Sequence, residues 1–450
     1  MTCRHSPGHG AWISLLAAAI SGCAARYYDT ADDGYWRNDA GSMVEAYRSA
    51  VDDTGPNALL GVERLLSAAL LQNDWRTAEA LAVRASTLCN IFVADEGGER
   101  DAISFFGQEK DKPFKGEPHE RVMVDLYLGL LRFQKQDFEG ALSAFRSAMN
   151  KDRGSYWIPV ERHLAKRGSD NADRYLFEDD WPLLQILCAK CHQLLDEPEE
   201  ARKYFERAST TLPVMKPLFE DLLDPETNVL VIVESGRAPL KRKTGPHGAE
   251  LGYVQGPRAT VDGVWLGESE LSTGTCEDLH YQATTVGGRE VDKLNQLKAE
   301  RREVLQAAGF TTAVAGYMLL AAGSGGHRRA DRNIQMAGLF ALAAGIAAMI
   351  IADLVIDPSA DVRSWATLPG QISLAVGRAM PGGRARLLVR GRGDVQDLSQ
   401  EWLDVPVEKG MNLYWTRLLP GRKGGSWEQP REDQVDGHGK APNENEFNSN

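Results

Sequence analysis

The string Cys188-Ala189-Lys190-Cys191-His192 combines residue types that can do covalent and metal chemistry. In an exported protein, two such thiols can add to the vinyl groups of haem while the histidine binds the iron. The alternative is structural, because a free cysteine packs as a small apolar residue and the string lies in a predicted helix. We favour the structural interpretation, since the string occurs once and no further ligand pair indicates a metal site. We therefore expect no cofactor, with c-type haem as the alternative.

Asp361, Arg363 and Trp365 form a second candidate cluster. On a strand these alternating residues would share one face. The guanidinium could then pair with the carboxylate and stack on the indole ring. Two interpretations follow, a structural corner that precedes a strand or a ligand contact, and the first is favoured.

Catalytic motifs are missing from the sequence. It contains no phosphate-binding glycine loop, no His-Glu zinc helix and no Gly-x-Ser-x-Gly elbow. We therefore predict that the protein is not an enzyme and assign no catalytic residue.

The amino terminus has the pattern of a targeting segment. Arg4 precedes an apolar run, Ala11–Ile20, that is too short to span a bilayer. This run has the length of a signal-peptide core. Residues 1–22 are therefore predicted to be a signal peptide, and the protein is expected in the cell envelope.

The signal segment ends in Ile20-Ser21-Gly22-Cys23, which resembles the lipobox of bacterial lipoproteins. The resemblance implies that Cys23 becomes the first residue and carries acyl chains such as palmitate. Each buried methylene of such a chain contributes about 0.8 kcal/mol to membrane binding. Because Ala24 rather than aspartate follows, the resemblance favours the outer membrane over the inner membrane. Residues 23–45 would link this anchor to the folded part.

Composition and charge place the protein among folded, acidic chains. Its 450 residues are 43% hydrophobic and 25% charged, with a net charge of −12. An acidic chain is a poor candidate for binding nucleic acid, so no nucleic-acid partner is expected. The basic cluster Lys241, Arg242 and Lys243 is interpreted as a solvated loop. The cysteines predicted to follow the signal peptide and Cys23 could form disulfides in an oxidising compartment, but their spacing predicts no pairing. They are Cys89, Cys188, Cys191 and Cys276.

Residues 46–224 have helical periodicity and a recurring pattern of small and aromatic residues. The pattern resembles the tetratricopeptide repeat, a unit of two helices whose small residues let the backbones approach. The two clearest copies place these residues at Gly129, Ala141, Phe145 and Ala148, and at Ala189, Ala201, Phe205 and Ala208. Stacked repeats form a concave groove, so the resemblance implies an envelope protein or peptide as the partner, with no contact residue assigned. The alternative is a generic helical bundle with alanine-rich seams.

The remainder of the chain is predicted to be a smaller β-rich domain, residues 225–308 and 357–420. Strands are expected at Val229–Val233, Gln371–Val376, Ala385–Val389 and Met411–Leu418. An apolar helical hairpin, residues 309–356, interrupts this domain. Its second stretch, Met336–Ile356, is long enough to span a bilayer, so membrane insertion is favoured. The alternative is that the hairpin packs against the strands or against another subunit. The tail, residues 421–450, is predicted to be disordered.

Two further short sequence blocks extend a family resemblance over most of the chain. They are Val231-Ile232-Val233-Glu234-Ser235-Gly236 and Ala360-Asp361-Val362-Arg363-Ser364-Trp365. Together with the lipobox and the repeats, they are similar to an uncharacterised family of bacterial lipoproteins with tetratricopeptide-like amino-terminal regions. The fold expectation is therefore α+β, with a helical-repeat domain followed by a β-rich domain. The function expectation is a lipid-anchored scaffold, with a haem redox protein or a membrane-embedded subunit of an envelope complex as alternatives.

Overall fold

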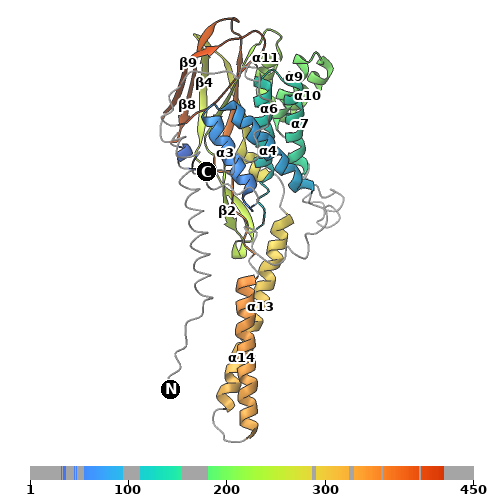
Figure 1. Cartoon of the computed structure of the whole chain (residues 1–450), viewed down its shortest axis with the longest axis vertical. Coiled ribbons are helices and arrows are strands. Elements are labelled where there is room, and N and C mark those ends of the chain that lie inside the picture. The colour runs from blue at the N-terminus through green and yellow to red at the C-terminus, as the bar shows by residue number, and fades with distance from the viewer. Residues whose placement is uncertain are drawn as a thin grey trace, which may run out of the picture.

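The structure is a computed structural model with a head of helices and strands and one long helical hairpin (Figure 1). It describes residues 55–94, 112–154, 181–285, 290–323, 329–355, 358–394 and 397–419, and single positions 32, 34–36, 45 and 47. The signal segment, Cys23 and the tail lie outside these residues. The mixture is 55% helix and 23% strand, which confirms the α+β expectation.

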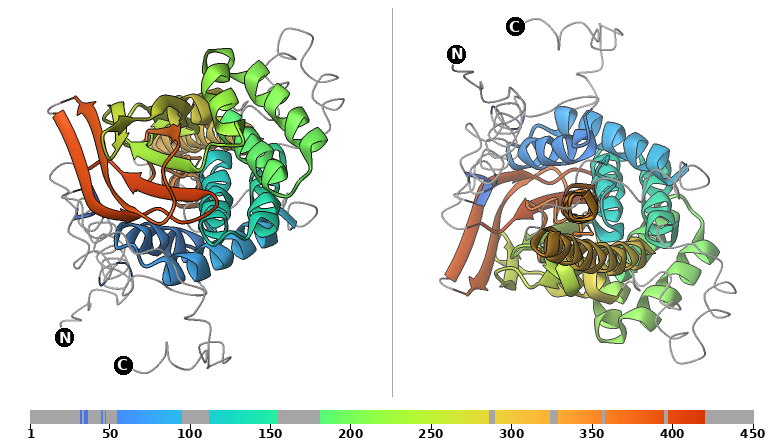
Figure 2. Two further views of the ribbon diagram at one scale, coloured as in Figure 1. Left: turned by 90° about the horizontal axis from the view of Figure 1, so that it is seen from above. Right: turned by 90° about the horizontal axis from the view of Figure 1, so that it is seen from below.

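Three consecutive helix pairs make up the helical side of the head. They are α3 (Ala58–Leu71) with α4 (Trp75–Ala94), α6 (Pro118–Gln134) with α7 (Phe138–Gly154), and α9 (Pro182–Leu194) with α10 (Pro198–Thr211). The second helix of each pair packs on the first helix of the next pair, so the pairs form a curved array (Figure 2).

The three pairs share one turn geometry. The turns place Asn73, Gln136 and Asp196 at φ of 58°, 63° and 61°, in the left-handed region. The residue that follows each of them donates its backbone N–H five residues back, as from Asp137 to the carbonyl oxygen of Arg132 at 3.0 Å. These bonds satisfy carbonyl groups at the end of the first helix. Glycine usually occupies this region of φ, and of the three residues found here Asn and Asp adopt it more readily than Gln.

Short helices η4 (Pro213–Met215) and α11 (Lys216–Leu223) lead into a four-stranded sheet in the order β10-β1-β7-β6. Its strands are β1 (Val229–Ser235), β6 (Ser272–Asp278), β7 (Gln371–Gly377) and β10 (Asn412–Arg417). Strand β1 pairs in parallel with β10, with Val231 opposite Tyr414, and antiparallel with β7. Every residue of β1 is buried, because this sheet is covered on both faces.

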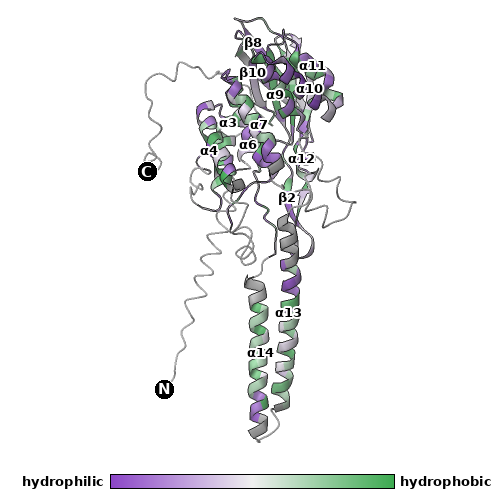
Figure 3. Cartoon of the chain, turned by 90° about the vertical axis from the view of Figure 1, so that its right-hand side faces the viewer, coloured by the Kyte–Doolittle hydropathy of each residue, from purple (hydrophilic) through white to green (hydrophobic). Residues whose placement is uncertain are grey.

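A second sheet covers the face opposite the helices, in the order β5-β4-β8-β9. Its strands are β4 (Ala259–Leu266), β5 (Ser269–Glu270), β8 (Arg384–Gly393) and β9 (Asp397–Pro406). The separate hairpin of β2 (Leu240–Thr244) and β3 (Glu250–Val254) points towards the base of the long helices, with η5 (Pro246–Gly248) at its tip (Figure 3). Helix α12 (Leu279–Thr285) lies between β6 and α13 (Glu290–Gly323) in the chain, and α14 (Arg329–Val355) completes the long hairpin.

The helices and both sheets share one continuous hydrophobic core, which extends from Leu59 in α3 to Leu418 after β10. No residue of α13 or α14 belongs to that core among the described residues. The strands expected around residues 229, 371, 385 and 411 are present. Sequence reasoning did not predict β2 to β6 or β9, which are short, polar or interrupted by glycine.

Candidate functional site

The α13–α14 hairpin is the most distinctive candidate site. Both helices are long and apolar enough to cross a membrane, over Lys298–Ala322 and Arg332–Ile350. At 1.5 Å per residue, the uncharged stretch from Val304 to Ala322 is about 28 Å long. This length is close to the hydrocarbon thickness of a bilayer, about 30 Å. The hairpin projects from the head, away from the three helix pairs (Figure 1, Figure 3). The amino-terminal part of α13 precedes the apolar hairpin that the sequence predicted at 309–356.

The distribution of side chains on this hairpin is the reverse of that in a soluble helix pair. Among the described positions from Gly309 to Ile350, the buried residues are small: Gly309, Ala313, Gly316, Gly338 and Gly345. Large apolar side chains point outwards instead, with Phe310, Tyr317 and Phe340 exposed by 63%, 66% and 68%. An exposed apolar surface of this kind indicates contact with lipid or with another protein.

Glycines allow the two helices to touch through their backbones. A Cβ atom added at Gly316 would lie 2.3 Å from the backbone nitrogen of Leu342, and one at Gly345 would lie 2.4 Å from the carbonyl oxygen of Gly309. Both distances are shorter than real contacts, so only glycine fits at this separation. Close packing through small residues is the usual way in which helices associate where burial of apolar side chains from water gives no driving force.

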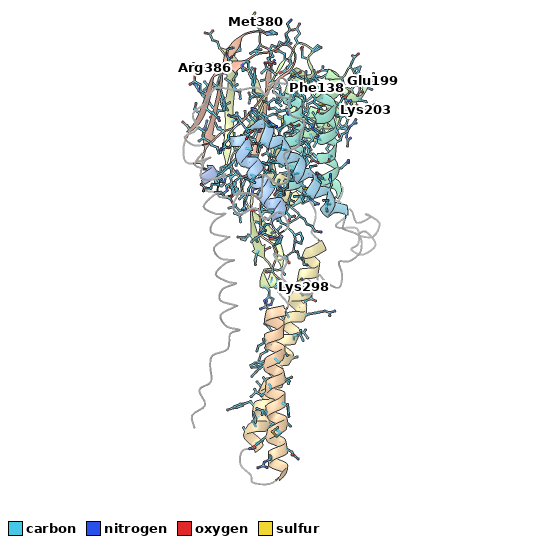
Figure 4. All side chains as sticks on the ribbon, in the orientation of Figure 1. Phe138, Glu199, Lys203, Lys298, Met380 and Arg386 are labelled. Atoms are coloured by element: carbon cyan, nitrogen blue, oxygen red, sulfur yellow. The ribbon has the colours of Figure 1, made fainter. Side chains whose placement is uncertain are left out.

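Two contacts fasten the base of the hairpin to the β2–β3 tip. His247 Nε2 lies 2.9 Å from Glu303 Oε1 on α13. On the other side, the backbone N–H of Ala360, after α14, donates to the carbonyl oxygen of Gly248 at 2.8 Å. Lys298 lies at this junction, where its side chain is buried (Figure 4). The tip is therefore held by α13 on one side and by the segment that follows α14 on the other.

The inner face of the helical array, where the sequence predicted a groove for a partner, is covered by the chain's own sheet. Almost every residue of α3, α6 and α9 is buried. Helix α6 packs on β10 and α9 on β6. The backbone N–H of Leu183 in α9 donates to Glu277 on β6 at 2.8 Å. The array therefore presents no open inner groove along these helices.

A buried ion pair joins the helices to this sheet. Arg417 Nε on β10 donates to Glu234 Oε2 on β1 at 2.7 Å, and Tyr127 of α6 donates to Glu234 Oε1 at 2.7 Å. Arg417 also donates to the hydroxyl of Tyr35 and to the carbonyl oxygen of Thr367. Burial raises the pKa of the Tyr127 hydroxyl, and the nearby Glu234 carboxylate raises it further, so Tyr127 stays a neutral donor.

Described residues near the amino terminus cover the same region. Arg64 Nη2 of α3 pairs with Asp32 Oδ2 at 2.9 Å, and the Tyr47 hydroxyl donates to Asp32 Oδ1 at 2.5 Å. The Arg237 guanidinium lies 5.3 Å from the Trp36 ring centre. The side chains of Asp32, Tyr35, Trp36 and Tyr47 therefore pack on the head.

Asp361, Arg363 and Trp365 lie on an irregular segment rather than on a strand, which corrects the strand assumption. Arg363 Nη2 pairs with Asp361 Oδ2 at 2.6 Å, and its other contacts fix the start of α3 through Asn57 Oδ1 at 2.9 Å. Its guanidinium stacks on Phe114 at 5.5 Å instead of on Trp365. The Trp365 indole is buried and donates to Ser67 Oγ at 2.8 Å. This cluster ties the segment after α14 to the helices.

A second buried charge cluster lies between α3, α6 and β2. Lys241 Nζ pairs with Glu120 Oε2 at 2.8 Å and its side chain is 2% exposed, which corrects the prediction of a solvated loop. Both carboxylate oxygens of Glu63 are buried, and its pKa is raised well above the usual range by burial first and then by Glu120. Burial lowers the pKa of His119 to about 4.

The residues of the Cys-x-x-Cys-His string do not fit haem attachment. Cys188 and Cys191 are fully buried in the core of α9, and burial raises the pKa of the Cys188 thiol to about 12. Both ring nitrogens of His192 are engaged, Nε2 with Arg146 Nη2 at 2.9 Å and Nδ1 with Glu197 Oε2 at 2.5 Å. Its ring also stacks on Tyr204 at 5.4 Å. The two cysteines therefore act as small buried residues between the packed helices, and the His192 ring is fixed by its contacts with Arg146 and Glu197.

The residues predicted to pack the repeats lie along the helix pairs. Ala141, Phe145, Ala148, Ala189, Ala201 and Ala208 are buried. Phe205 is half-buried against the core. A Cβ atom added at Gly129 would lie 2.2 Å from the Phe145 ring, so this glycine makes room for the aromatic side chain.

Among the described residues, no group of His, Cys, Asp or Glu is placed to hold a metal ion, and the four described cysteines are free thiols. A small pocket lies between α3, α4, α6 and β10, lined by Leu70, Trp75, Leu131, Gln134 and Trp415 among others. Its walls are mostly apolar and carry no arrangement of acid, base and nucleophile.

Two features of the site escaped sequence reasoning. The Glu234–Arg417 pair joins strands that are distant in sequence, and a single glutamate in an apolar run was its only signal. The contact between His247 and Glu303 on α13 had no sequence signal, because it depends on where the β2–β3 tip lies. Comparison with protein-family models, with curated protein sequences and with solved structures finds no match.

Proposed function

We propose that this chain is a non-catalytic cell-envelope protein that is embedded in a membrane through α13 and α14 and holds a rigid head at the surface. The outward-facing apolar side chains of the hairpin carry this proposal. Their exposure to water would cost about 25 cal/mol for each Å² of apolar surface, whereas hydrocarbon removes the cost. The hairpin enters and leaves through the same end of the head, so the whole head lies on one side.

The proposed signal peptide and the acyl chains on Cys23 would place the head on the outer side of the membrane. The end of the hairpin distant from the head, with Arg328 and with Arg329 and Arg332 at the start of α14, would then face the cytoplasm, as the positive-inside rule favours. This arrangement supports the inner membrane, whereas Ala24 favours the outer membrane. We propose the inner membrane, because basic residues between two membrane-spanning helices favour a cytoplasmic position for that end of the hairpin.

Extraction at alkaline pH separates the hairpin from the lipid anchor. In a chain with an ordinary cleavable signal peptide and Cys23→Ser, the hairpin alone should keep the protein in the membrane pellet. Deletion of residues 304–351 from that chain should release the head into the supernatant. Release of the Cys23→Ser chain with its hairpin intact would contradict insertion.

We also propose that the helix pairs are tetratricopeptide-like and that the head is a scaffold for an envelope protein. The turn geometry that the three helix pairs share, and the buried positions of Ala141, Phe145 and Ala148, support the tetratricopeptide-like interpretation. Because the sheet covers the inner face, the partner would contact the outer face formed by α4, α7 and α10. That face carries exposed charges such as Glu199 and Lys203 (Figure 4). Photo-cross-linkers at these two positions should give a discrete protein adduct in intact cells, and their failure to do so would count against this surface.

A further inference from the structure

The tip of the β2–β3 hairpin lies where a membrane surface would be if α13 and α14 are inserted. Glu303, which contacts His247, is the last charged residue before the apolar stretch that begins at Val304. The headgroup layer on each side of a bilayer is about 5–7 Å thick, from the difference between its total and hydrocarbon thickness. A tip fixed to Glu303 therefore lies within that layer.

Two exposed cations lie just behind this tip. Arg242 and Lys243 are on β2, within three residues of the turn at Gly245, which is about 10 Å at the usual rise of a strand. Neither side chain has an ion-pair or hydrogen-bond partner in the part of the chain that the structure describes. Their neighbour Lys241 differs, because it is buried against Glu120. The two free cations are thus available to a ligand outside the chain.

The contacts of His247 with Glu303 and of Gly248 with Ala360 determine which ligand these cations can reach. His247 holds the β2–β3 tip to Glu303 on α13, and Gly248 holds it to Ala360 in the segment after α14, so the tip lies beside the base of the α13–α14 hairpin. The chain as a whole is acidic, with a net charge of −12, so long-range attraction of the protein to an anionic surface needs a local basic site. Basic residues near an anionic membrane each favour binding by about fivefold.

We propose that the β2–β3 tip binds the headgroups of anionic phospholipids through Arg242 and Lys243. The inference rests on the proposed insertion of the hairpin and adds a lipid preference to it. The bound lipids fix the tilt and height of the head above the bilayer, since the tip is continuous with the sheet hairpin.

The test uses the full chain in vesicles of phosphatidylcholine with or without phosphatidylglycerol. A photo-cross-linker replaces exposed Pro246 at the tip, and a second chain carries it at Tyr317 in the hairpin. We expect adducts at position 246 to be enriched at least about fivefold in phosphatidylglycerol relative to its share of the lipid. The double substitution Arg242→Ser and Lys243→Ser should remove this enrichment.

Arg202→Ser with Lys203→Ser is the matched control, an exposed Arg-Lys pair on α10 far from the hairpin, and it should leave the enrichment unchanged. Acyl-chain adducts at position 317 without lipid selectivity at position 246 would overturn this inference and leave the hairpin proposal intact. A protein adduct at position 246 in place of lipid would overturn it too. Absence of lipid adducts at position 317 would overturn both proposals.

Discussion

At the scale of single residues, the Glu234–Arg417 pair is the polar centre of the head. Both side chains are 1% exposed, and the pair connects β1 and β10 to Tyr127 on α6. Removal of one member leaves the other charge buried without its partner, which is more costly than replacement of both. The pair therefore makes the position of the helices depend on the sheet.

Glu234→Ala should lower the free energy of unfolding by about 3–5 kcal/mol, because it leaves the Arg417 guanidinium unpaired. Denaturant unfolding of the detergent-solubilised chain measures this change. Glu199→Ala on the exposed face of α10 is the control and should change it by less than about 0.5 kcal/mol. Glu234→Leu combined with Arg417→Met should recover most of the loss. If Glu234→Ala were no more harmful than the control, the pair would not stabilise the head.

His119 should make stability depend on pH. Burial lowers its pKa from 6.5 to about 4. As the pH falls, the ring is therefore protonated in the unfolded chain before it is protonated in the folded head. This contribution is fully present above pH 6.5 and is lost as the pH falls from 6.5 towards 4. The shift corresponds to about 3 kcal/mol, with the nearby charges of Glu117, Glu120 and Lys241 included in it.

His119→Phe should therefore flatten the loss of stability between pH 6.5 and 4, when unfolding is measured at a series of pH values. The comparison with the parent cancels the opposite effect of Glu63, whose raised pKa favours the folded state as the pH falls. Val214→Phe, at an exposed position without a titrating side chain, should retain the parent's pH profile. An unchanged profile in His119→Phe would show that this ring is not the group responsible.

At the scale of elements, the glycine seam sets the separation of α13 and α14. Gly316→Leu would force the Cβ atom away from the Leu342 nitrogen, so the helices must separate by at least about 1 Å to reach normal contact. Spin labels at Leu319 and Leu339 should show weaker dipolar broadening in this variant. Thr311→Leu, on an exposed position of α13, should leave the broadening unchanged. Equal spectra for both variants would contradict close packing at the seam.

Elements with a strong period or an apolar run could be predicted from the sequence, and those made by distant contacts could not. The run Val229–Val233 fixed β1, and the small residues around Phe145 indicated paired helices. Strand β2 escaped because Lys241, Arg242 and Lys243 look like a solvated loop, and only the position of Glu120 explains why the first of them is buried. The covered inner face depends on contacts such as that between Trp365 and Ser67, which lie far apart in sequence.

At the scale of the whole molecule, the hydrophobic core stabilises the head, and the described residues of the α13–α14 hairpin lie outside that core. The head is stabilised by a continuous core that excludes the described residues of α13 and α14. The hairpin exposes its large apolar side chains and is fastened to the head through His247 and Gly248. The molecule therefore combines a self-contained head with an apolar projection that needs another environment.

The most direct test is the environment of the outward side chains in the reconstituted full chain. Spin labels placed one at a time at Phe310, Tyr317 and Phe340 report collisions with oxygen, which concentrates in hydrocarbon, and with a water-soluble nickel chelate. High oxygen and low nickel accessibility are expected at all three positions, and the reverse is expected for a label at Glu199 on the head. High nickel accessibility at Tyr317 and Phe340 would place the hairpin in water and contradict its insertion in a membrane.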